Sequence, residues 1–186
     1  MALQLIRRRF AVSEYHQMAQ SGILGEDDRV ELIDGEVTQM TPIGRRHAAC
    51  VKRLNKLFGK TFGDDAVVSV QDPIVLSDYT EPQPDLAILR PSPDFYVAGH
   101  PKPEDVLLLV EVAETSADLH RQVKAPLYAR SGIREAWLVD LEQETVTIYR
   151  DPTPSGYATQ RVVRRGEQLA ALGFPGRSLA AATVLG

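Results

Sequence analysis

The sequence has only one cysteine, Cys50, and its four histidines are scattered along the chain. A single cysteine excludes an internal disulfide, and no zinc-ligand spacing of cysteines or histidines is present. No apolar stretch approaches the roughly 20 residues that a membrane span needs, and the segment from Met1 to Phe10 lacks the apolar run of a signal peptide. We therefore expect a soluble, cytoplasmic protein with no membrane partner, in which any metal ion is bound by oxygen atoms.

The composition is that of a globular protein. Of the 186 residues, 44% are hydrophobic and 25% are charged. This length and mixture predict a single domain over residues 1–186, with a sizeable core. The formal net charge of −4 weighs against broad affinity for nucleic acid, because such binding depends on contacts between basic side chains and phosphates.

One basic segment stands out against this acidic balance. Apolar residues at Val51, Leu54 and Phe58 have helical spacing, and the positions before, between and after them carry Arg45, Arg46, His47, Lys52, Arg53, Lys56 and Lys60. Such a run is typical either of a solvated helix face or of a nucleic-acid-binding surface. Both interpretations stay open, and the candidate contacts to nucleic acid are Arg45, Arg46, His47 and Lys52.

Periodicity and turn residues predict an alternation of strands and helices. Helices are expected from an N-cap at Ser13 to Gly22, over 45–62, and over 118–130, where Pro126 should kink or split the helix. Strands are expected over 29–34, 36–40, 66–70, 73–76, 85–90, 106–113, 136–140, 146–149 and 157–163, with a hairpin turn at Asp34-Gly35 and a surface loop over 91–103. Beyond Gly166 the pattern indicates only short strands or loop.

This order of elements predicts the fold class. The helix over 118–130 stands between two apolar strands and is expected to be a crossover connection. The class is therefore α/β, with a mixed β-sheet flanked by helices and an N-terminal β-hairpin.

Glu111 is the most informative single residue. It interrupts the apolar run from Val106 to Ala113, which is typical of a strand buried on both faces. A buried carboxylate without a partner costs several kcal/mol or more, so such a residue is paired, protonated or bound to a cation. Asp85 opens another expected strand after Pro84, and neighbouring strands would bring the two acids together.

Two acidic oxygens at adjacent strand ends suit Mg²⁺ or Mn²⁺ better than zinc or copper. Such a cation lowers the pKa of a bound water and offsets charge on a phosphoryl group. The alternative is a structural pair, in which Asp85 caps a turn and Glu111 is bridged to an arginine. The pattern alone leaves both open.

Several short motifs, taken in order, resemble the bacterial Uma family (Uma-two), a branch of the PD-(D/E)xK restriction-endonuclease-like superfamily. The resemblance covers roughly residues 10–150. The motifs are Glu31 to Glu36, His47 at a helix start, Pro84-Asp85, Val110-Glu111-Val112, Lys124, and the stretch from Tyr128 to Asp140.

The resemblance implies a restriction-endonuclease-like core and a Mg²⁺-dependent endonuclease that hydrolyses phosphodiester bonds in DNA. Asp85 and Glu111 would hold the metal. The superfamily lysine normally follows the second acid by two positions, where this chain has Ala113; the Uma family has a lysine on the following helix instead, which is Lys124 here. The family pattern also implies that Glu31 is an additional acid of the site. Cutting both strands of a duplex would favour a twofold homodimer.

Other interpretations stay open for these residues. The sequence is also consistent with Lys124 being a solvated residue beside an apolar stripe. Glu31 would then be an ordinary polar residue of an alternating strand, and His47 a residue with a local hydrogen bond. At the level of function, the alternatives are a nuclease-like fold that binds nucleic acid or a protein partner without cutting, and a hydrolase of a smaller phosphate ester.

Overall fold

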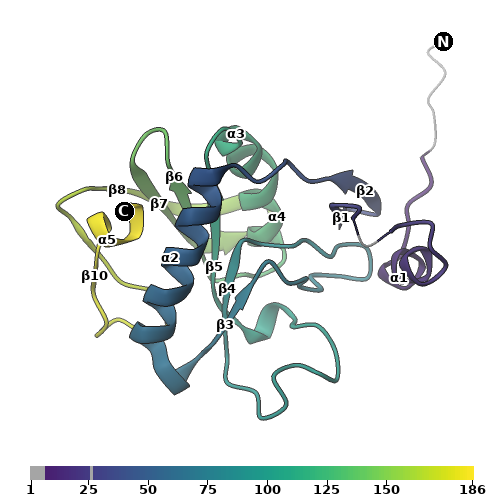
Figure 1. The fold of residues 1–186 in the computed structure, drawn as a ribbon, viewed down its shortest axis with the longest axis horizontal. Coiled ribbons are helices and arrows are strands. Elements are labelled where there is room, and N and C mark those ends of the chain that lie inside the picture. The colour runs from purple at the N-terminus through teal and green to yellow at the C-terminus, as the bar shows by residue number, and fades with distance from the viewer. Residues whose placement is uncertain (1–6, 26) are drawn as a thin grey trace.

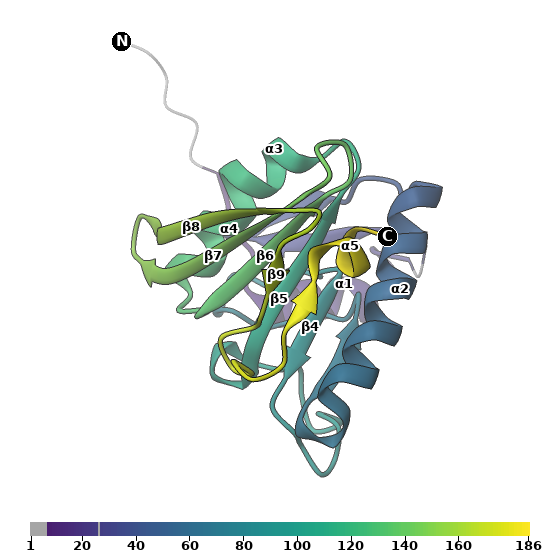
Figure 2. The ribbon, with the colours of Figure 1, turned by 90° about the vertical axis from the view of Figure 1, so that its left-hand side faces the viewer.

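The computed structural model describes residues 7–25 and 27–186, so part of the segment weighed as a signal peptide, residues 1–6, lies outside the described residues. A six-stranded mixed sheet is covered by helices on both faces (Figures 1 and 2). The elements are α1 (Val12–Gln20), β1 (Val30–Ile33), β2 (Glu36–Gln39), α2 (Arg45–Phe62), η1 (Gly63–Asp65), β3 (Val67–Val70), β4 (Leu86–Leu89), η2 (Pro103–Asp105), β5 (Val106–Ala113), α3 (Ala117–Leu119), η3 (His120–Lys124), α4 (Ala125–Arg130), β6 (Glu135–Asp140), β7 (Thr145–Thr153), β8 (Gly156–Arg164), β9 (Gln168–Leu169), β10 (Leu179–Ala180) and α5 (Ala181–Leu185).

The six strands lie in the order β3-β4-β5-β6-β7-β8. Every neighbouring pair is antiparallel except β5 and β6, which are parallel. Parallel neighbours need a crossover connection, and the segment from α3 to α4 supplies it. The predicted crossover and the predicted α/β class with a mixed, helix-flanked sheet are confirmed.

Apart from Glu111, strand β5 is apolar because both of its faces are covered. Leu108, Val110 and Val112 join the core with α2 and α5, whereas Leu109 and Ala113 join the core with α4. Burial of each such leucine or valine contributes about 1.5–3 kcal/mol relative to exposure. The alternation places Glu111 on the face covered by α4.

Helix α2 has the bounds that the apolar spacing predicts. It buries Cys50, Val51, Leu54, Phe58 and Phe62 against the sheet and leaves its basic residues outside, apart from the partly buried His47 and Arg53. The helix ends at Gly63, whose φ of 53° is a conformation that favours glycine. Figure 2 shows α2 running along one side of the sheet, with α3 and α4 on the other.

The N-terminal hairpin is also confirmed. Asp34 and Gly35 have φ of 52° and 80° between β1 and β2, as a tight hairpin turn requires. The hairpin forms its own two-stranded sheet and is joined to the body by an antiparallel bridge between Leu32 and Glu81. This bridge fixes where the neighbouring residue Glu31 lies.

The helix expected over 118–130 is split, as Pro126 predicts. Residues His120–Lys124 form a π turn, in which the N–H of Ala125 donates to the carbonyl of His120. Proline lacks an N–H and disfavours the regular helix just before it, and single π turns are frequent at functional sites. Both His120 and Lys124 are buried by this turn.

Two local predictions are wrong and a third is incomplete. Ser13 does not cap α1, because the N-cap is Ala11, whose N–H donates to the Glu14 side chain. Residues 73–76 form no strand; the N–H groups of residues 74–76 instead bond to loop carbonyls, including those of Pro82 and Pro101. The chain beyond Gly166 has the expected short strands, β9 and β10, but also the helix α5, which covers the sheet beside α2.

In the part of the chain that the structure describes, every helix is too short or too polar to cross a lipid bilayer.

Candidate active site

Two carboxylates meet where β4 begins and β5 ends. These strands are antiparallel with Leu86 paired to Val110, so Asp85 lies opposite Glu111. The Asp85 carboxylate accepts a hydrogen bond of 2.9 Å from the N–H of Val112, and the Glu111 carboxylate lies 3.4 Å from the N–H of Asp85. The two residues are 8% and 5% exposed, so each depends on partners that replace water.

His47, near the start of α2, is the main partner of Asp85. Its Nε2 lies 3.0 Å from one carboxylate oxygen, and the Gln71 amide donates to the other at 3.2 Å. Burial alone would lower the pKa of His47, but the hydrogen bond to Asp85 and the charges of Asp85 and Glu111 raise it. Burial alone would raise the pKa of Asp85, and the bonds from His47, Val112 and Gln71 lower it. The pair therefore favours an ionised carboxylate beside a protonated imidazole.

Glu111 has three polar neighbours on the helical crossover. The Tyr128 hydroxyl donates a short hydrogen bond to Oε1, and Nζ of Lys124 lies 3.3 Å from the same oxygen. Nδ1 of His120 lies 3.9 Å from Oε2 and has no hydrogen-bond partner among the described residues, while its Nε2 lies 3.1 Å from the Ser116 hydroxyl. Burial lowers the pKa of His120, so a neutral imidazole faces Glu111 at pH 7.

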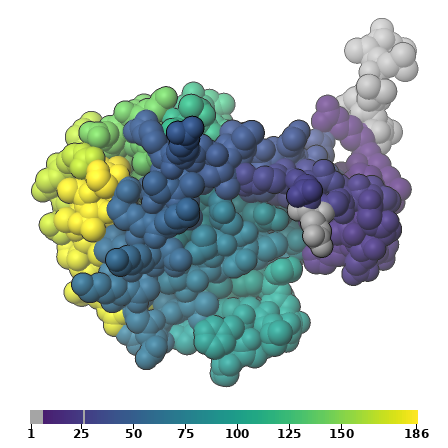
Figure 3. Space-filling view, in the orientation of Figure 1, coloured from purple at the N-terminus to yellow at the C-terminus, as the bar shows by residue number. Residues whose placement is uncertain are grey.

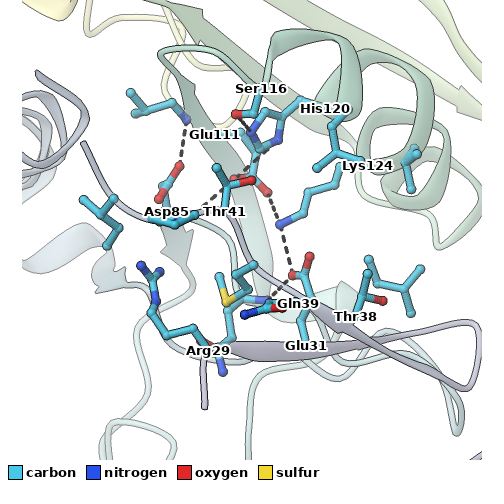
Figure 4. Close-up of a pocket in the computed structure, with 18 of the residues that line it drawn as sticks. Arg29, Glu31, Thr38, Gln39, Thr41, Asp85, Glu111, Ser116, His120 and Lys124 are labelled. Atoms are coloured by element: carbon cyan, nitrogen blue, oxygen red, sulfur yellow. Dashed lines mark hydrogen bonds and ion pairs between the residues drawn. The ribbon is translucent and has the colours of Figure 1, made fainter. Parts of the chain in front are cut away.

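Lys124 connects Glu111 to Glu31. Its Nζ lies 3.0 Å from Glu31 and 3.3 Å from Glu111, and Figure 4 shows the amine between the two carboxylates. Burial alone would lower the pKa of Lys124, but the charges of Glu111 and Glu31 raise it above its ordinary value. The amine is therefore a permanent cation at neutral pH. Lys124 is 5% exposed, which excludes the alternative of a solvated lysine, and Pro126 does not turn it away from the acids.

Glu31 reaches the site because β1 is bridged to the segment that leads into β4. One of its carboxylate oxygens accepts a hydrogen bond of 3.2 Å from the N–H of Gln83 and is paired with Lys124. At 5% exposed, Glu31 is not an ordinary solvated strand residue. The hairpin thus brings a third carboxylate to the two acids of the sheet.

Most of these side chains, but not Gln71 or the buried Tyr128, line a cavity of about 730 Å³ between the hairpin, the start of α2, and the helical crossover (Figure 4). Six acidic side chains line it, namely Glu31, Asp34, Glu36, Asp85, Glu111 and Glu114, against three arginine or lysine side chains, Arg9, Arg29 and Lys124, and two histidines, of which His47 has a raised pKa. An acidic cavity repels a phosphate group unless a cation offsets the charge. Carboxylate oxygens are the ligands that Mg²⁺ and Mn²⁺ prefer, so the donor set of Asp85 and Glu111 fits such an ion.

The predicted basic surface is only partly at the cavity. Among its four candidate residues, His47 lines the cavity, whereas Arg45, Arg46 and Lys52 lie outside it and are exposed. Arg46 donates instead to the carbonyl of Leu141 at 2.8 Å. Contact between these residues and nucleic acid stays a prediction.

Sequence reasoning missed three side chains of the site: His120 and Arg29, which line the cavity, and Tyr128, which is buried against Glu111. Tyr128 stands inside the family-like stretch but gave no sign of its bond to Glu111, and His120 and Arg29 belong to no motif. One sequence signal could have pointed to His120. It lies four positions before Lys124, on a segment already expected to be irregular at Pro126. The Glu114 side chain, which also lines the cavity, lies 3.4 Å from the N–H of His47, at the start of α2.

Comparison with solved structures supports the α/β fold. The chain matches a crystal structure from Anabaena variabilis ATCC 29413, described as a "putative nuclease belonging to DUF820", with a TM-score of 0.73 and 14% sequence identity over 95% of this chain and 97% of that one. At this identity the likeness shows the fold alone. No curated protein matches the chain.

A comparison with protein-family models identifies the family. The model of the Uma2 family, described as "Putative restriction endonuclease", matches residues 12–182. The chain therefore belongs to the Uma2 family, which confirms the resemblance carried by the short motifs.

Proposed function

We propose that this protein is a Mg²⁺-dependent endonuclease that hydrolyses phosphodiester bonds in DNA. One observation carries the proposal: two carboxylates on adjacent strand ends, Asp85 and Glu111, line a deep acidic cavity together with a lysine that both burial and pairing hold in place. Membership of the Uma2 family supports phosphodiester chemistry. Mn²⁺ would serve in place of Mg²⁺, because it accepts the same oxygen ligands.

Asp85 and Glu111 would hold the cation, which when bound lowers the pKa of a water and offsets charge on the phosphate. Lys124 has a different role. Because its pKa is raised by Glu111 and Glu31, it cannot accept a proton at neutral pH and acts as a fixed positive charge. Such a charge stabilises the extra negative charge of the phosphate in the transition state.

Glu31 would keep the Lys124 ammonium in position. Its carboxylate is 3.0 Å from the Lys124 amine and is itself fixed by the N–H of Gln83. His47 would likewise fix the orientation of Asp85. The superfamily lysine would stand two residues after Glu111, where this chain has Ala113, which is fully buried and faces the apolar core. Lys124 would take the place of that lysine.

The test is a cleavage assay on duplex DNA with Mg²⁺, using Asp85→Asn and Glu111→Gln variants. Their matched controls are Asp64→Asn and Glu142→Gln, which change exposed acids outside the cavity. We expect both site variants to lose cleavage and both controls to keep it. Equal cleavage by the parent and the site variants would contradict the mechanism. A parallel assay on RNA and on a dinucleotide ester identifies the substrate class.

A second candidate is a nuclease fold that binds nucleic acid or a protein partner without cutting. Ala113 at the place of the strand lysine favours it, as do the exposed basic residues of α2 outside the cavity. It predicts DNA binding that survives chelation of metal, weakens with salt, and is lost on changing Arg45 and Lys52 to alanine. Cleavage by the parent protein that stops in the Glu111→Gln variant would exclude it.

A further inference from the structure

We propose that His16, Glu81 and His100 form a second metal site, separate from the acidic cavity and selective for a transition-metal cation such as Zn²⁺. Within the described ranges, they are the only group of three histidine, cysteine or acidic residues whose ligand atoms all lie within 4.8 Å of one another. None of them lines the acidic cavity.

The three side chains come from three separate segments. His16 lies on α1, Glu81 on the segment bridged to β1, and His100 near the end of the loop after β4. Nε2 of His16 is 2.9 and 3.0 Å from the two oxygens of Glu81. The rings of His16 and His100 meet edge to face, with centroids 5.9 Å apart, and the ligand atoms of both imidazoles and of the Glu81 carboxylate lie within 4.8 Å of one another.

The surroundings of Glu81 indicate that it needs a cation. Glu81 is 3% exposed, yet among the described residues neither a lysine nor an arginine pairs with it, and His16 is the partner of both oxygens. The other buried glutamates among the described residues have permanent cations, Lys124 beside Glu31 and Glu111, and Arg150 beside Glu135. A divalent ion would supply the missing charge.

The donor set selects the kind of ion. Two imidazole nitrogens and one carboxylate are the ligand type that suits Zn²⁺ and its neighbours, whereas Mg²⁺ and Ca²⁺ prefer oxygen alone. Three protein ligands leave one position of a tetrahedral zinc for water. His16 is 40% exposed at its side chain and His100 is exposed, so the ion has access from solvent.

Such an ion would fasten two weakly held segments to the body. Helix α1 contributes no buried residue to the core, and the loop over 91–102 forms neither helix nor strand. Figure 3 shows the purple N-terminal segment at one end of the molecule, away from the C-terminal helix. Glu81 is bridged to Leu32, which follows Glu31 of the acidic cavity in the sequence. The two sites are therefore close together, but they have no ligand in common.

The test is zinc binding by the full chain, after removal of metal with a chelator, measured by competition with a chromophoric chelator. We expect one Zn²⁺ per chain. The His100→Gln variant should bind at least about tenfold more weakly, since even loss of a residue that supports a ligand costs 10–100-fold. His100 is the informative position, because its exposed side chain has no hydrogen bond among the described residues, so the variant should fold.

The matched control is the Asp85→Asn, Glu111→Gln double variant, which alters the acidic cavity and should keep its zinc. Zn²⁺ should also raise the Tm of the parent and of this control but not that of His100→Gln. The proposal is overturned if the parent binds no zinc, if His100→Gln binds it as tightly as the parent, or if the double variant loses it. None of these readouts depends on nuclease activity.

Discussion

Glu111 and Glu135 lie on adjacent parallel strands, and both are almost completely buried. Glu135 is fully satisfied by the protein: its carboxylate accepts hydrogen bonds from Arg150, the Trp137 indole and the N–H of Leu172. Glu111 instead faces a cavity and shares a lysine with another acid. The two residues show that burial of a carboxylate does not by itself indicate chemistry; what decides is whether its partners leave an open space beside it.

The strongest way to sharpen this comparison is to neutralise Glu111. We expect the Glu111→Gln variant to lose Mg²⁺-dependent cleavage by at least about a thousandfold, because a bound cation contributes several kcal/mol of transition-state stabilisation. The fold should persist, because the glutamine side chain can still accept a hydrogen bond from the Tyr128 hydroxyl. Initial cleavage rates and circular dichroism measure the two properties, and a variant that cuts within a few fold of the parent would break the distinction.

The converse change is made at Glu135. Glu135→Ala leaves Arg150, the Trp137 indole and the N–H of Leu172 without their acceptor and should lower the free energy of unfolding by about 3 kcal/mol, because each buried donor left without a partner costs about 1–3 kcal/mol. Urea unfolding measures it. Cleavage per folded molecule should stay near that of the parent at a temperature where the variant is folded. Loss of cleavage in a fully folded Glu135→Ala protein would place Glu135 in the site as well.

Replacing Lys124 tests whether its charge acts on the substrate. Lys124→Met keeps the length of the side chain and removes the charge, and we expect cleavage to fall by about a hundredfold, the lower range for loss of one group that stabilises charge in the transition state. The fall should appear in kcat rather than in KM. The exposed Lys60→Met is the matched control, and an effect on KM alone would assign Lys124 to substrate binding.

The smallest expected effect is at His47 and depends on pH. The pKa of His47 is raised in the folded protein by Asp85. The stabilisation of the fold by this ion pair is therefore complete at a pH below the pKa of histidine in the unfolded chain, near 6.5. It is lost as pH rises through the pKa of His47 in the folded protein. The parent should therefore be more stable than His47→Gln by about 1–3 kcal/mol at pH 6, with a smaller difference at higher pH. Urea unfolding in the absence of metal at several pH values measures it, and a difference independent of pH would contradict the ion pair.

The sequence predicted the parts of the fold with strong patterns. The buried run of β5 and the apolar spacing of α2 are long enough to determine their bounds, and the interruption of β5 by Glu111 pointed to the cavity. Residues 73–76 are apolar too, but their hydrogen bonds go to loops that no local pattern describes. Asp85, Glu111, Lys124 and Glu31 lie together in the structure, whereas their roles stay predictions.

Other features of the site depend on tertiary contacts that leave no sequence signal. His16, Glu81 and His100 have no regular spacing, because three unrelated segments bring them together. The scattered histidines therefore suggested that any metal is bound by oxygen, which fits the acidic cavity and not this second cluster. The alternative in which Glu111 is bridged to an arginine is wrong, because the cation beside Glu111 is Lys124; the buried glutamate that pairs with an arginine is Glu135.

The most direct test of the central claim is a crystal structure of the protein soaked in Mn²⁺, with anomalous scattering used to locate the ion. We predict a peak between the carboxylates of Asp85 and Glu111, with oxygens at roughly 2.0–2.2 Å, allowing for Mn²⁺ being slightly larger than Mg²⁺. A map with no peak there, in which Asp85 stays bonded to His47 and Glu111 to Lys124, would contradict the claim that these acids bind the metal of a nuclease.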